Sequence, residues 1–250
     1  VTGQEKKAIP LMEAELSRLR SLGLHEELSL NYLMYAEILL AEETRKLTLG
    51  GFAEFSGFCR YLELAEEHAA FNRSAVDYLL FAKILRLGAD LLVHPEKALS
   101  GVKDILRMAK DAVPFFQTLA YGRVANALHL LGKDMEQSKA CYRKSIEIGE
   151  KHGTLNIPMI CYGELAAVFL REGNSMEAEE CARKCLTFSL QFGHRYYFRL
   201  KSLFSEVLKF ALEKGILPEF TREMLAYGGY ETHRVYINTL GTFYVAPAHD

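Results

Sequence analysis

Two segments of the chain, 41 residues apart, share one arrangement of apolar, small and polar positions. They begin at Tyr121 and Tyr162 and read "YGRVANALHLLGKDMEQSKACYRKSIEIG" and "YGELAAVFLREGNSMEAEECARKCLTFSL". In each segment the aromatic, small and large apolar residues recur every three to four positions, which is the period of one helix face. Gly132 and Gly173 follow, and glycine commonly ends a helix. Each segment therefore predicts two antiparallel helices joined by a tight turn.

Polar residues after each glycine predict where the second helix starts. Asp134 with Gln137, and Asn174 with Glu177, have the spacing of a capping box. In that motif the first side chain accepts a hydrogen bond from a backbone N–H group of the first helical turn. We therefore expect both second helices to begin directly after these capping residues.

Weaker copies of the pattern extend the repeat in both directions. Tyr78 lies 43 residues before Tyr121, Tyr32 lies 46 residues before Tyr78, and a fifth unit starts near Arg195. Fixed-period helix pairs bury their apolar faces by stacking on their neighbours, as in a solenoid. The sequence thus predicts an all-α chain with helices at 8–22, 27–48, 52–71, 74–92, 95–112, 115–131, 134–152, 157–172, 175–192, 195–214 and 218–227.

The repeat resembles tetratricopeptide (TPR) repeats in its order of aromatic, small, Gly, then small, aromatic and small positions. It departs from them in its period of 41 to 46 residues, against the usual 34, and in having no Trp. Longer units of this kind resemble the helical-repeat sensor domains of large bacterial regulators of the maltose-activator type, over residues 8–230. The resemblance implies a right-handed superhelical solenoid of about five antiparallel helix pairs.

The end of the chain has a different pattern. The segment "VYINTLGTFYV" is rich in β-branched and aromatic residues, which predicts one or two short strands. Its pattern V-x-I-x-x-L-G-x-F-x-V resembles the opening strands of a response-regulator-type winged-helix DNA-binding domain of bacterial activators. Residues 211–229 resemble the segment that joins a helical-repeat array to such a domain. The pattern falls on Val235, Ile237, Leu240, Gly241, Phe243 and Val245.

Together these resemblances imply a domain division and a function. Residues 1–230 would be the TPR-like array, and residues 231–250 a linker and the first strands of a winged-helix domain that continues beyond Asp250. A nucleotide-binding switch module would precede Val1. The chain would then be the sensor and coupling domain of a cytoplasmic bacterial transcription regulator, binding a small-molecule effector or a protein or peptide on its concave face. The alternative is a free-standing TPR-like adaptor that binds a peptide or protein and has no DNA role.

The net charge and the hydropathy of the chain limit the kinds of partner that it is expected to bind. The chain has 30 Lys and Arg residues against 32 Asp and Glu residues, a net charge of −2. Strong nucleic-acid binders usually carry a basic excess, so DNA contact is expected only through the domain beyond Asp250. The longest apolar runs are far shorter than the 18 or more residues of a membrane span. Exposed apolar faces at the ends of such an array can drive self-association into a homodimer.

No catalytic or cofactor motif stands out in the sequence. It contains no G-x-x-x-x-G-K-[ST] phosphate loop and no H-E-x-x-H arrangement. Cys181 and Cys185 lie four residues apart, but no second Cys or His pair accompanies them, and structural zinc usually has four ligands. The odd total of five Cys fits reduced thiols in a cytosolic protein. We therefore expect no enzymatic activity, no metal and no cofactor.

Candidate ligand-binding residues follow from the repeat. In such arrays the first helix of each pair lines the concave face, and positions one residue and four or five residues after the motif Ala point toward it. The resulting cluster is polar and slightly basic, and its arginines suit an anionic group or a sugar. The alternative is a solvated groove lined by ordinary polar residues. The candidates are Lys83, Arg86, Asn126, His129 and Arg171.

Overall fold

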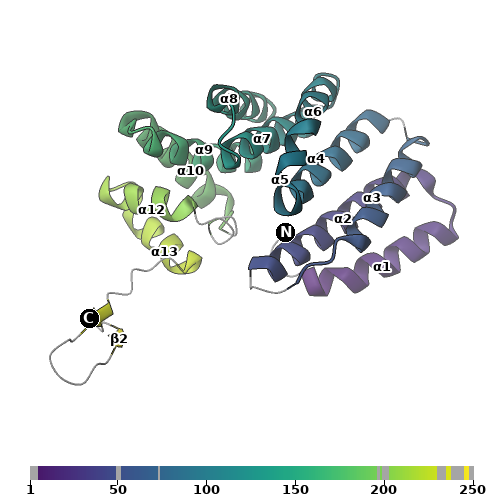
Figure 1. Cartoon of the computed structure of the whole chain (residues 1–250), viewed down its shortest axis with the longest axis horizontal. Coiled ribbons are helices and arrows are strands. Elements are labelled where there is room, and N and C mark those ends of the chain that lie inside the picture. Colours follow the sequence, from purple (N-terminus) through teal and green to yellow (C-terminus); the bar gives the residue numbers. More distant parts are fainter. Residues whose placement is uncertain are drawn as a thin grey trace. The chain divides into compact units, whose positions relative to one another are not determined.

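The computed structural model describes residues 5–48, 52–72, 74–195, 198, 203–229, 235–237 and 245–247. These residues are mostly helical (Figure 1), which confirms the predicted all-α class. The chain divides into two compact units, residues 1–165 and 166–250. The predicted domain boundary between residues 230 and 231 stays a prediction.

The first unit is built from helices that follow the predicted ranges closely. Helix α2 packs against α1 and α3, α4 packs against α2, α3 and α7, and α7 packs against α8. The predicted helix 95–112 is interrupted by one 3₁₀ turn at Leu99–Gly101, so it forms two pieces. The helices are α1 (Glu5–Ser21), α2 (His25–Thr48), α3 (Ser56–Ala69), α4 (Ala75–Val93), α5 (Pro95–Ala98), α6 (Val102–Ala109), α7 (Pro114–Leu130), α8 (Met135–His152) and the larger part of α9 (Asn156–Arg171).

The core of the first four helices comes from their apolar periodic positions. Leu16 of α1, Leu33 of α2 and Leu62 of α3 are each at most 1% exposed and belong to one cluster. Burying a side chain of this size contributes roughly 1.5–3 kcal/mol relative to leaving it in water. Apolar positions of these helices thus meet in one buried cluster.

The second unit contains the end of α9, α10 (Ser175–Phe192), α12 (Leu203–Glu213) and α13 (Pro218–Gly228). Helix α12 packs against α10 and α13. Most of the residues at the start of the predicted helix 195–214 lie outside the described residues. Two three-residue strands follow, β1 (Val235–Ile237) and β2 (Val245–Pro247), which pair antiparallel. Leu240, Gly241 and Phe243 of the winged-helix-like pattern lie outside the described residues, so that interpretation stays a prediction.

The repeat is visible in the hydrogen bonds that end the first helix of two pairs, α7–α8 and α9–α10. Gly132 after α7 has a φ of +60°, and the N–H of the next residue donates to the Leu128 carbonyl at 2.9 Å. Gly173 after α9 has a φ of +75°, and the N–H of the next residue donates to the Phe169 carbonyl, also at 2.9 Å. Glycine adopts this left-handed conformation without the steric cost of a side chain. The two turns, 41 residues apart, are therefore locally equivalent.

The two second helices start differently. Asp134 accepts a hydrogen bond from the Gln137 N–H at 3.0 Å, so its predicted capping role is confirmed. Asn174 makes no side-chain cap hydrogen bond, so the same prediction is wrong there. The backbone accounts for the difference: Asp134 has φ 40° and ψ 66°, whereas Asn174 has φ −89° and ψ 79°. The spacing predicted both helix starts, but not the backbone angles that orient the capping side chain.

Candidate binding sites

Two of the predicted site residues, Lys83 and Arg86, lie on α4 and are held by ion pairs. Lys83 Nζ lies 2.7 Å from Asp104 Oδ2 of α6, and Arg86 Nη2 lies 3.2 Å from Glu66 Oε1 of α3. The hydrogen bond from Lys83, with a second from Arg107, holds the pKa of the Asp104 carboxyl below its ordinary value. All of these groups are substantially exposed, so each bridge contributes little stability. An anionic ligand would have to compete with these carboxylates.

Asn126 and His129 share α7, one turn apart, and both are buried, at 7% and 6% exposure. Neither Asn126 Nδ2 nor Tyr142 Oη has a hydrogen-bond partner among the described residues. Burial raises the pKa of the Tyr142 hydroxyl, an effect that the nearby Asn126 amide opposes. Asn126 and His129 are therefore buried side chains of α7 rather than residues of an open surface.

Arg171 belongs to the second unit, where it ends α9. Its Nε atom lies 3.8 Å from Glu206 Oε2 of α12, and both side chains are more than half exposed. The five predicted residues are thus placed as a pair on α4, a pair on α7 and one residue in the other unit. That they form a single site stays a prediction.

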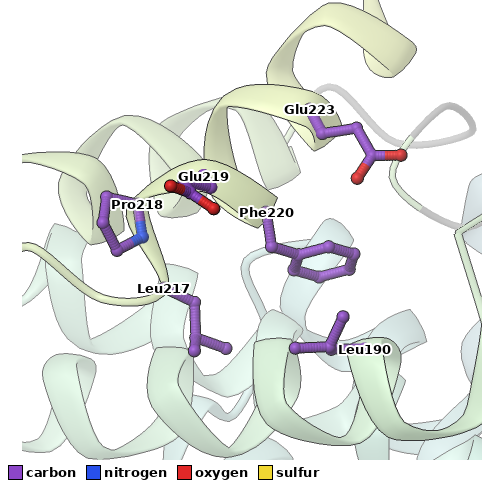
Figure 2. Close-up of a pocket in the computed structure, with 6 residues that line it drawn as sticks. All are labelled: Leu190, Leu217, Pro218, Glu219, Phe220 and Glu223. Carbon is purple, nitrogen blue, oxygen red and sulfur yellow. The ribbon is translucent and has the colours of Figure 1, made fainter.

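Sequence reasoning missed a pocket in the second unit. It lies between the end of α10 and the start of α13, has a volume of about 440 Å³, and appears in Figure 2. Three large apolar side chains lie close together in it, and two carboxylates come from the first turns of α13. Leu190 is 48% exposed. The lining residues are Leu190, Leu217, Pro218, Glu219, Phe220 and Glu223.

Leu217 reaches the pocket from a strained backbone conformation. It is the N-cap of α13, with φ 42° and ψ 59°, and makes no side-chain cap hydrogen bond. Left-handed geometry costs a residue with a Cβ roughly 1–2 kcal/mol, and a residue before proline prefers extended angles. Asp134 has a similar φ of 40° but gains a capping bond. The signal in the sequence is therefore a Leu directly before Pro218, where a capping Ser, Thr, Asp or Asn is expected.

Charges mark the rim of the pocket. Arg195 forms an ion pair with Glu223, and its guanidinium carbon lies 5.9 Å from the centre of the Phe220 ring. Glu219 lies one helical turn before Glu223 and is exposed. Among the described residues no ion pair involves Glu219. The arrangement can bind an apolar group together with a cation.

The remaining chemistry of the described residues is limited. Within them, no group of three or more His, Cys, Asp or Glu side chains is placed to hold a metal ion. None of the described helices combines the length and the apolar character needed to cross a membrane. Comparison with known protein families and with curated proteins finds no match to this chain.

Proposed function

We propose that this chain is the sensor and coupling domain of a cytoplasmic bacterial transcription regulator. In this proposal the helix pairs form a TPR-like, right-handed superhelical solenoid of about five units. The array binds a small-molecule effector or a protein partner, and DNA is bound only by a winged-helix domain beyond Asp250. The chain itself performs no catalysis.

The observation that carries the proposal is the order of two features along the chain. Helix pairs with equivalent glycine turns 41 residues apart come first. The segment at 235–245, with its resemblance to the opening strands of a winged-helix domain, follows them directly. A purely helical array has no use for a β-rich segment, and a short hairpin alone is marginally stable at best.

In this proposal, ligand binding is coupled to DNA binding by a shift in the populations of the regulator's two states. A ligand changes the state of the regulator only by as much as its affinities for the two states differ. A stack of helix pairs suits this role because each pair contacts only its neighbours, so a small change at each interface adds along the array. Binding in the array thereby changes the position or availability of the DNA-binding domain.

The first test is the native coding sequence on both sides of this chain. The regulator proposal expects it to continue beyond Asp250 for about a hundred residues with a winged-helix pattern. An effector screen by thermal shift on this chain then follows. A reading frame that stops at or near Asp250 contradicts the regulator and supports the adaptor, because the β-rich segment would then have no domain to belong to.

A further inference from the structure

We propose that the pocket between α10 and α13 is a docking site for a protein partner. The partner inserts an apolar side chain beside Leu190, Leu217 and Phe220 and places a neighbouring Lys or Arg against Glu219. This inference goes beyond the proposed function, because it holds equally for a regulator and for a free-standing adaptor.

The pocket opens widely to solvent, so a side chain of a partner can enter it. Its volume of about 440 Å³ lies in the range of roughly 300–1,000 Å³ that is typical of ligand sites. Leu190 is 48% exposed although it lies beside two other apolar side chains (Figure 2). Covering this surface with an apolar side chain of a partner is favourable in proportion to the area removed from water.

The rim specifies the charge of the partner. Glu219 and Glu223 are four residues apart on α13, so they lie on one face of the helix. The chain's own Arg195 already pairs with the second of these carboxylates, Glu223, and lies over the Phe220 ring. This resident guanidinium shows that the rim accepts a cation next to an apolar surface. The Glu219 carboxylate is then available for the corresponding cation of a partner, and it disfavours an anionic ligand.

The backbone conformation of Leu217 is a second, independent observation in favour of a docking site. Gly or Asn would adopt its φ of 42° at lower cost, and a polar N-cap would add a hydrogen bond. Leu217 provides neither, yet it brings a branched apolar side chain to the pocket (Figure 2). Local strain of this kind commonly occurs at ligand-binding sites. Its presence here is explained if the side chain is needed for docking.

The test uses a fluorescein-labelled helical peptide with leucines at positions i and i+4 and arginines beside them. Binding to the full 250-residue chain is followed by fluorescence anisotropy. One matched peptide carries glutamates in place of the arginines, and another carries serines in place of the leucines. We expect the leucine–arginine peptide to bind and each replacement to weaken binding by about tenfold or more. If the leucine–arginine peptide does not bind, or the three peptides bind alike, the proposal is overturned.

Substitutions in the pocket lining test whether the peptide binds at this pocket. Leu190→Ser and Glu219→Gln should each lower the affinity of the chain for the leucine–arginine peptide by about tenfold. Glu213→Gln is the matched control, because Glu213 is an exposed carboxylate of α12 outside the pocket lining. Leu217→Gly relieves the strained backbone, so it should keep the thermal stability and still lose affinity. Unchanged binding by Glu219→Gln contradicts the proposal. A failed peptide test leaves the DNA-binding test of the regulator unaffected, so the two proposals fail separately.

Discussion

At the scale of single residues, two helical glycines have opposite expected responses to alanine. A Cβ at Gly149 would lie 2.3 Å from Pro158 Cγ and 3.0 Å from the Thr154 carbonyl oxygen. We expect Gly149→Ala to lower the free energy of unfolding by about 1–3 kcal/mol, because overpacking of this kind outweighs the gain in helix propensity. A Cβ at Gly88 would meet Leu40 Cδ2 at an ordinary 3.5 Å. Gly88→Ala should therefore raise the free energy of unfolding by about 0.5–1 kcal/mol.

Urea denaturation of the two variants measures this difference. Pro158→Ala in the Gly149→Ala background should recover part of the loss, since the closest of these contacts is with the Pro158 ring. Equal stability of the Gly149→Ala and Gly88→Ala variants would show that the Pro158 contact relaxes without cost.

The His25–His68 pair predicts a pH dependence of stability. The two Nδ1 atoms lie 3.2 Å apart, so one ring donates its proton to the other. Burial lowers the pKa of His68, and the charges of His25 and Arg20 lower it further, against an opposing contribution from Glu67. An unfolded His has a pKa of about 6.5, so the unfolded state binds more protons as the pH falls below that value. The stabilising contribution is therefore present above about pH 6.5 and is lost as the pH falls through the lower folded pKa.

A double-mutant cycle measures this pair. His25→Gln, His68→Gln and the double variant give the coupling free energy between the two rings at about pH 7.5 and about pH 5.5. We expect favourable coupling at the higher pH and its loss or reversal at the lower pH. A coupling that grows on acidification would contradict a hydrogen bond between two neutral rings.

At the scale of elements, the helices could be predicted because their apolar positions repeat every three to four residues. The predicted range 134–152 is observed as Met135–His152, and 175–192 as Ser175–Phe192. The apolar period of the sequence does not predict the 3₁₀ turn at Leu99–Gly101, since the turn leaves that period unchanged. The sequence predicts the start of α3 at residue 52, whereas the helix begins at Ser56, after an N-cap residue, Phe55, that makes no side-chain cap hydrogen bond.

The capping difference between equivalent turns is a prediction at the element scale. Asp134→Ala removes the hydrogen bond to the Gln137 N–H and should lower the free energy of unfolding by about 1 kcal/mol. Asn174→Ala removes no cap hydrogen bond and should change it by less than about 0.5 kcal/mol. Chemical denaturation of both variants measures these two changes in the free energy of unfolding. A loss at Asn174→Ala as large as that at Asp134→Ala would mean that Asn174 stabilises the helix start by another route.

At the scale of the whole molecule, the candidate sites were harder to predict than the elements. The repeat predicts Lys83 and Arg86 from their positions on one helix, but the carboxylates that pair with them come from α6 and α3. The pocket joins Leu190 to Phe220, 30 residues later, through packing that no local pattern reports. Sequence periodicity describes one helix at a time, whereas a site depends on which side chains from different helices meet.

The net charge of the chain predicts that it binds DNA weakly by itself. The chain has a net charge of −2, with 30 basic and 32 acidic residues, so it lacks the basic excess that releases counterions from DNA. The 250-residue chain alone should show no saturable binding to labelled duplex DNA tighter than about 10⁻⁴ M at physiological salt. A longer chain that includes about a hundred residues beyond Asp250 should bind the same duplex, with an affinity that falls steeply as salt rises. Tight, salt-dependent binding by the shorter chain would place the DNA-binding surface within the helical repeats and overturn the proposed division of roles.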